Sequence, residues 1–172
     1  DQFDAFNGAP DRYDWKLVGK KEIYVPYNSY KLSDKKLKYK EDIIRTFTPN
    51  ADLMRYELHR VWEIEANLKP GSRHIYAKRV FYLDEDSWAL MVADIYDAQG
   101  KMWRVQESSV FPAPELPACV GQEFVSYDLS VGRYIGENAT QEQPETDWLA
   151  GREGRIDPRK FNPDELRRVG ER

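Results

Sequence analysis

The stretch that decides the fold is MRYELHRVWEIEANLKPGSRHIYAKRVFYLDEDSWALMVADIYDAQGKMWRVQESSVF, residues 54–111. Apolar and polar side chains alternate along it, most clearly in residues 54–68, and a period of two is typical of a strand with one buried face. Turn residues interrupt the alternation at KPGS (69–72), DEDS (84–87) and AQG (98–100). The pattern therefore predicts a meander of four antiparallel strands, at residues 54–68, 73–83, 87–97 and 102–111.

The short turns also predict how these strands pair. If residue 68 faces 73, 83 faces 88 and 97 faces 102, one face receives the even positions of the first and third strands and the odd positions of the second and fourth. That face is apolar and rich in aromatic side chains. We expect it to line a hydrophobic cavity, with these residues in its wall: Trp62, Phe81, Trp88, Tyr96 and Trp103.

Each of the four strands also adds one charged side chain to this apolar face: Arg60, Arg79, Asp94 and Glu107. Unpaired charges on a buried face are costly, so these groups need partners. The predicted register puts Arg79 and Glu107 in one cross-strand row and Asp94 on the diagonal, so we expect Arg79 to pair with one of these carboxylates. Three interpretations stay open: an ion-pair network that holds the sheet, a polar patch for the head group of a ligand, or an acid/base pair of Asp94 and Glu107.

The same register separates the two histidines, His59 and His74, by roughly 26 Å. Ligands of one metal ion lie ~2 Å from it, so we do not expect these histidines to share one. Cys119 is the one cysteine, which excludes an internal disulfide, and no activating motif surrounds it. The chain also lacks a Gly-rich phosphate loop, a Gly-x-Ser-x-Gly motif and a Cys-x-x-Cys motif. We therefore expect no metal, no cofactor and no catalytic residue.

The segments on either side of the meander continue the β pattern and then lose it. Residues 13–27 alternate with an interruption at Gly19, which predicts two strands bent at that glycine. EFVSYDL and GRYIG predict two further short strands. We assign residues 1–137 to part of a single antiparallel β half-barrel domain.

Residues 138–172 predict a polar C-terminal tail with a short helix near 162–169. Asn162 suits the N-cap of that helix, Pro163 suits its first position, and Glu165 completes a capping box.

Composition narrows the class of protein. The chain has 172 residues, of which 41% are hydrophobic and 33% charged, and a net charge of −4. It offers no basic face for nucleic acid, so we expect no nucleic-acid partner. No apolar run approaches the ~18 residues of a membrane span, and no signal peptide opens the chain.

Three long strings carry a resemblance to a known family: FNGAPDRYDWKLVGKKEIYVPYNSYKL, MRYELHRVWEIEANLKPGSRHIYAKRVFYLDEDSW and DIYDAQGKMWRV. With the terminal FNPDELRRVGER, they make nearly the whole chain resemble a bacterial envelope family, domain of unknown function 1329. Members of that family are longer. The chain therefore resembles their C-terminal part, with a secretion signal and further strands upstream.

The resemblance implies a fold similar to the lipoprotein-localisation carriers, which is an incomplete antiparallel β-barrel around a hydrophobic cavity. It also implies a periplasmic or outer-membrane-associated location and a lipid or other hydrophobic small molecule as cargo. Outer-membrane proteins and inner-membrane exporters are the partners it suggests, together with the upstream part of the same protein. It supplies no proven activity.

We therefore expect a mostly β protein that binds or carries hydrophobic molecules in the periplasm and is not an enzyme. Two alternatives stay open. One is a scaffold subunit of an envelope complex that docks through residues 138–172. The other is a lipid-directed hydrolase or isomerase that uses the carboxylates of Asp94 and Glu107.

Overall fold

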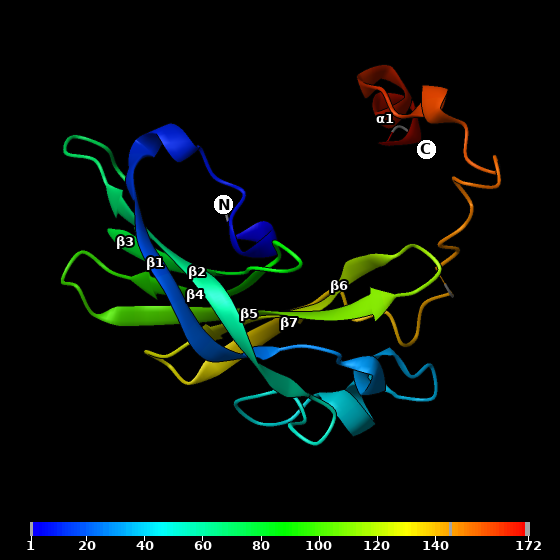
Figure 1. The fold of residues 1–172 in the computed structure, drawn as a ribbon, viewed down its shortest axis with the longest axis horizontal. Coiled ribbons are helices and arrows are strands. Elements are labelled where there is room, and N and C mark those ends of the chain that lie inside the picture. Colours follow the sequence, from blue (N-terminus) through cyan, green and yellow to red (C-terminus); the bar gives the residue numbers. More distant parts are fainter. Residues whose placement is uncertain (1, 145, 171–172) are drawn as a thin grey trace.

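The computed structural model describes residues 2–144 and 146–170 and is built around one curved, unclosed sheet (Figure 1). Seven antiparallel strands follow one another in chain order across this sheet, so each strand pairs with its neighbours in sequence. The fold class predicted from the alternating pattern is confirmed. The strands are β1 (Tyr13–Pro26), β2 (Tyr56–Leu68), β3 (Lys78–Asp84), β4 (Leu90–Tyr96), β5 (Met102–Ala113), β6 (Ala118–Asp128) and β7 (Arg133–Glu137).

Helical structure is confined to short segments outside the sheet. Five are single turns: η1 (Phe3–Ala5), η2 (Pro10–Arg12), η3 (Tyr30–Ser33), η4 (Tyr39–Ile43) and η5 (Pro158–Lys160). The helix α1 (Pro163–Gly170) lies at the end of the tail and stands apart from the sheet (Figure 1). Asn162 Oδ1 accepts hydrogen bonds from the backbone N–H groups of Asp164 and Glu165, which caps this helix.

The four predicted strands of the meander are present as β2 to β5, but β3 begins later than the sequence predicts. Residues 69–77 form the connection, in which the backbone N–H of Leu68 donates to the carbonyl of Ala77 over 2.9 Å. Trp62 consequently pairs with Leu83, and Ala66 pairs with Arg79. The pairing differs from the predicted one by an even number of residues, so the same side chains still share a face.

The pairing of β3 with β4 differs from the predicted pairing by an odd number of residues, which changes the face that the β4 side chains occupy. Beyond the turn, Leu83 pairs with Leu90, but a bulge at Met91 then shifts the register, so that Arg79 pairs with Ile95 and Tyr82 with Val92. A shift of one residue moves every following side chain to the other face. The predicted continuous apolar face is therefore wrong beyond Leu90.

A second bulge lies in β1 and exchanges the faces on which its side chains lie from that point on. Leu17 pairs with Ile64 and Gly19 pairs with Glu63, which leaves Val18 as the extra residue. Gly19 has a φ of +150°, which only glycine adopts without strain. The predicted interruption at Gly19 is real, but the chain passes through it as one continuous strand and not as two.

Each face of the sheet carries its own apolar cluster. We call them the Phe81 face and the Tyr82 face, after neighbouring residues of β3. The Phe81 face buries Ala5, Tyr13, Ala66, Phe81, Ala93 and Phe124. The Tyr82 face buries Val25, Tyr27, Val61, Val80, Tyr82, Met91 and Val110. A parallel bridge from Tyr27 to Val110 joins the end of β1 to β5, so the sheet curls around the Tyr82 cluster.

Candidate functional site

The four charged residues predicted to share one face are divided between the two faces of the sheet. Arg60 and Arg79 lie on the Phe81 face, whereas Asp94 and Glu107 lie beyond the Met91 bulge on the Tyr82 face. The expected ion pair of Arg79 with Asp94 or Glu107 is therefore wrong. Arg79 is fully buried and its guanidinium lies over the ring of Tyr76, 4.9 Å from the ring centre.

Arg60 reaches out of the sheet. Its Nε donates to Glu85 over 2.6 Å, and the arginine side chain is 57% exposed. An exposed pair of this kind contributes little to stability. The two arginines therefore do not form one polar patch.

The five aromatic residues predicted to line one cavity are also separated. Trp62 and Phe81 share the Phe81 face, and Tyr96 lies on the Tyr82 face. Trp88 stands in the β3–β4 turn and is 67% exposed. Trp103 lies where the β4–β5 register shifts and packs against the ring of Tyr76, with 5.5 Å between the ring centres.

Asp94 and Glu107 are each held by tyrosine hydroxyls. Tyr82 donates to Asp94 over 2.9 Å. Tyr56 and Tyr127 donate to the same oxygen of Glu107, over 3.1 and 3.3 Å. Burial raises the pKa of both carboxyls, and the tyrosine hydrogen bonds only partly offset that effect. Both carboxyls therefore already have hydrogen-bond partners.

A pocket of about 550 Å³ lies where the segment after η3 folds against the last two strands. Apolar side chains of Ile43, Ile44 and Pro49 form one wall, and Tyr134, Ile135 and Gly136 of β7 form another. Ile44 and Pro49 are joined by a β-bridge, which closes the loop that carries that wall. The remaining lining residues are Tyr39, Glu123, Asn138 and Ala139.

Glu123 carries the one charged side chain among the residues that line this pocket. It is 3% exposed, and burial raises its pKa to about 7. Within the described part of the chain, Glu123 Oε2 has no hydrogen-bond partner. The other lining hydroxyls are occupied, because Tyr39 donates to the carbonyl of Ala139 and Tyr134 donates to that of Arg45.

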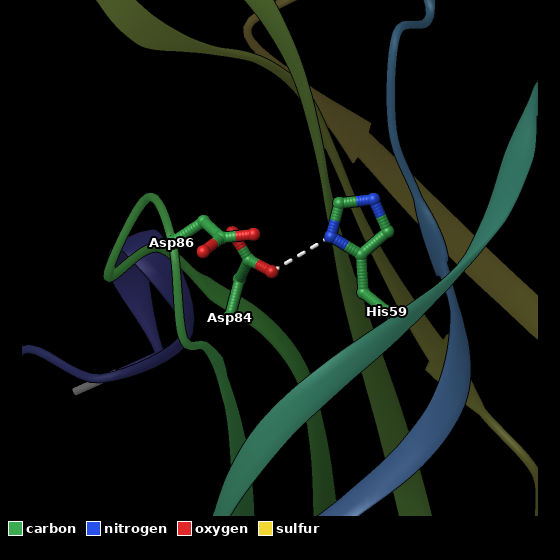
Figure 2. Close-up of side chains that lie close together, drawn as sticks. All are labelled: His59, Asp84 and Asp86. Atoms are coloured by element: carbon green, nitrogen blue, oxygen red, sulfur yellow. Dashed lines mark hydrogen bonds and ion pairs between the residues drawn. The ribbon is translucent and has the colours of Figure 1, made fainter.

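A second polar cluster joins β2 to the β3–β4 turn. His59, Asp84 and Asp86 each place a possible ligand atom within 4.8 Å of the others. Figure 2 shows the hydrogen bond between His59 and Asp84, with Asp86 beside them and no bond drawn to it. The distance from His59 Nδ1 to Asp84 Oδ1 is 2.8 Å.

This cluster holds the turn together. Asp84 is fully buried, and its other oxygen accepts hydrogen bonds from the backbone N–H of Ser87 over 2.8 Å and from its hydroxyl over 2.6 Å. Burial opposes ionisation of Asp84, but the hydrogen bonds from Ser87 and His59 outweigh it and lower the pKa of that carboxyl. Asp84 therefore has its hydrogen bonds satisfied without a metal ion.

The same geometry bears on metal binding and on catalysis. Two ligands of one ion stand roughly 3–3.5 Å apart, so an ion would have to break the hydrogen bond between His59 and Asp84. The Ser87 hydroxyl donates to Asp84 and not to His59. Ser87 and His59 therefore do not form a nucleophile with its general base. His59 also packs on the ring of Tyr27, whose hydroxyl lies 3.1 Å from the sulfur of Cys119.

His74 lies beyond the far end of β2, in the connection to β3. Its Nδ1 accepts a hydrogen bond from the backbone N–H of Tyr76 over 3.0 Å. Burial and the nearby charges of Arg79 and Arg12 lower the pKa of His74. It is not a member of the group formed by His59, Asp84 and Asp86.

Sequence reasoning missed both Glu123 and Asp84. Glu123 sits in QEFVSYD, where an acidic residue precedes an apolar run, and that position was one signal for a buried carboxyl. Asp84 opens DEDS, and an aspartate three residues before a serine is a common turn anchor. Neither signal says which side chain the rest of the fold will cover.

Comparison with known proteins identifies a family and a similar protein of known sequence. The family model described as "Protein of unknown function (DUF1329)" matches residues 1–167. An uncharacterized protein of Pseudomonas aeruginosa is 54% identical over 145 residues, which are 83% of this chain and 31% of that protein. The chain thus spans about a third of the length of that relative.

Two solved structures are similar at low identity. One is a DUF1329 family protein from Desulfovibrio piger, with a TM-score of 0.46, 14% identity, and coverage of 73% of this chain and 38% of that chain. The other is a putative outer membrane lipoprotein-sorting protein domain from Vibrio parahaemolyticus, with a TM-score of 0.45, 10% identity, and coverage of 91% and 48%. Among the residues described, no helix is long and apolar enough to cross a membrane.

Proposed function

For this chain, which belongs to the family described as "Protein of unknown function (DUF1329)", we propose a carrier function. The chain would bind hydrophobic small molecules or lipids and carry them in the bacterial periplasm. The observation that carries the proposal is the pocket between residues 39–50 and the strands β6 and β7. Its volume of about 550 Å³ lies in the range of small-molecule sites, and its walls are mainly apolar.

The periplasmic location and the partners belong to the same proposal. A carrier for apolar molecules is needed where such molecules must cross an aqueous space between two membranes. An outer-membrane protein would then receive the cargo or an inner-membrane exporter would supply it. The upstream part of the same polypeptide would complete the carrier.

The test is to fill the pocket and ask whether an apolar ligand is lost. Gly136 lines the pocket, and a Cβ at that position would lie 3.4 Å from Glu123 Oε1. Gly136→Val should therefore reduce the volume available to a ligand. Gly121→Val is the matched control, because Gly121 lies in the neighbouring strand β6 and a Cβ there meets no atom within 4 Å.

Pyrene is a suitable probe, because its emission reports the polarity around it. We expect the chain and Gly121→Val to bind pyrene saturably, and Gly136→Val to bind at least roughly tenfold more weakly. Equal binding by all three, or binding by none, contradicts the proposal. Mass spectrometry of protein purified under native conditions from its source then identifies the natural cargo.

A specific observation also favours the scaffold alternative. The tail exposes three large apolar side chains on and near α1: Phe161 at 77%, Leu166 at 75% and Val169 at 67%. An amphipathic helix with such a face can enter a groove on a partner. Replacing these three residues by serine should release an envelope protein that co-purifies with the chain, while pyrene binding stays unchanged.

A further inference from the structure

The pocket contains a carboxyl group for which the described residues provide no partner. Glu123 Oε2 is buried without a hydrogen bond, and the side chain as a whole is 3% exposed. Leaving a carboxylate in such a place is energetically unfavourable unless a donor satisfies it. Asp94 and Glu107, on the same sheet, each have tyrosine donors. Glu123 is the exception among these three.

The charge balance of the pocket is one-sided. None of its lining residues is a lysine or an arginine. Lys38, which directly precedes the covering segment, pairs with Glu142 over 3.6 Å, and both side chains are at least a third exposed. The negative charge of Glu123 therefore has no positive neighbour among the lining residues.

From this geometry we propose that the pocket binds an apolar molecule that carries a protonated amine, with Glu123 as the acceptor for the ammonium group and the rings of Tyr39 and Tyr134 beside it. This inference rests on the proposed function, because it needs the pocket to admit an apolar ligand. It adds the head-group chemistry. A protonated amine donates up to three hydrogen bonds and is attracted by aromatic faces.

The chemistry of the site discriminates between head groups. An alcohol can donate one hydrogen bond but brings no charge. A carboxylate brings a second negative charge close to Glu123, and like charges in an apolar site repel strongly. The ammonium of the ligand would also favour the ionised form of Glu123, since an opposite charge lowers the pKa of a carboxyl.

The experiment compares three probes that share one chain: octylamine, octanol and octanoate. Each competes with pyrene for the chain at about pH 8, where the amine is protonated and Glu123 is largely ionised. We expect octylamine to bind roughly tenfold more tightly than octanol, and octanoate to bind more weakly than either. Glu123→Gln should abolish the preference for octylamine, and Glu115→Gln, which changes an exposed glutamate in the β5–β6 turn, should keep it.

The outcomes separate the two proposals. If pyrene binds and the three probes then compete equally, or Glu123→Gln retains the preference for octylamine, the amine proposal is overturned and the hydrophobic pocket stands. If pyrene itself does not bind, the proposed function has failed, and the amine proposal fails with it. If Glu123→Gln does not fold, the order of the three probes on the unmodified chain decides.

Discussion

Arg79 lies directly across from Ile95, and Asp94, the preceding residue of β4, points to the opposite face of the sheet. The bulge at Met91 is responsible, because one extra residue exchanges the two faces for the rest of the strand. A buried arginine and two half-buried carboxylates that look like partners in the sequence therefore have separate surroundings. This arrangement can be tested by mutation.

Arg79 and Glu107 should not be energetically coupled. In a double-mutant cycle of Arg79→Met and Glu107→Gln, we expect an interaction energy within about 0.5 kcal/mol of zero, since the two side chains share no face. Tyr127→Phe and Glu107→Gln should instead couple by about 1 kcal/mol, because the Tyr127 hydroxyl donates to Glu107. Urea unfolding of each variant measures both cycles. Strong coupling in the first cycle would show that the register of β3 and β4 is wrong.

Glu123 should destabilise the fold as the pH rises. Its carboxyl has a pKa of about 7 in the folded chain and an ordinary value of 4.5, so the folded state keeps a proton that the unfolded state has already lost between these values. Stability is therefore full below about pH 4.5 and falls until about pH 7. The difference in pKa corresponds to roughly 3 kcal/mol.

Glu123→Gln should remove this dependence. We expect it to be more stable than the unmodified chain by up to about 3 kcal/mol at pH 8, and nearly equal at pH 4.5. Unfolding in urea at both pH values gives the difference, with Glu115→Gln as the control for a change in net charge. A gain that is the same at both pH values would contradict a raised pKa.

Asp84 should be the main anchor of the β3–β4 turn. Asp84→Ala removes the hydrogen bonds to His59 and Ser87 and should lower stability by about 3 kcal/mol, whereas Asp86→Ala should change it by less than about 0.5 kcal/mol, because Asp86 is exposed. The pKa of Asp84 is lowered, so its contribution is present above its ordinary value of 3.8 and is lost as the pH falls.

The same two variants test whether the cluster is a metal site. If Zn²⁺ raises the melting temperature of the unmodified chain but not of Asp84→Ala or Asp86→Ala, the three residues bind a metal and the turn-anchor interpretation is wrong. We expect no such difference.

The bulge in β1 should depend on glycine for its backbone. Gly19→Ala should cost roughly 1 kcal/mol, because the φ of +150° is unfavourable for alanine while the space around the position is open. Gly121→Ala is the control, since the surrounding space is also open and its φ is not in the positive range. Thermal unfolding measures both. An equal effect at the two positions would contradict the strain at Gly19.

Alternation along residues 54–111 was sufficient to predict four strands and their order, because each strand buries at least one face and the turns between them are short. It was not sufficient for the site. The sequence around Met91 does not reveal the bulge, because Leu90 and Met91 are both apolar and either residue can face a core. The residues predicted for one cavity were divided for that reason.

The pocket depends on contacts that periodicity does not describe. Its covering wall comes from residues 39–50, which have little regular structure, and its position over β7 is held by long-range contacts such as the one between Tyr134 and the backbone of Arg45. Such contacts depend on shape and hydrogen bonding between distant segments. One sequence gives no pattern from which to predict them.

The bridge between Tyr27 and Val110 has a consequence for how the chain acquires its structure. Most strands of the sheet pair with a neighbour across a short turn, and hairpins of this kind form in microseconds. The bridge instead joins segments far apart in the sequence, as does the contact between Tyr27 and Cys119, which are 92 residues apart. Closing so large a loop is entropically unfavourable until the intervening hairpins shorten it. We therefore expect the curl of the sheet to form last during folding, and mutations at Tyr27 to accelerate unfolding more than they slow folding.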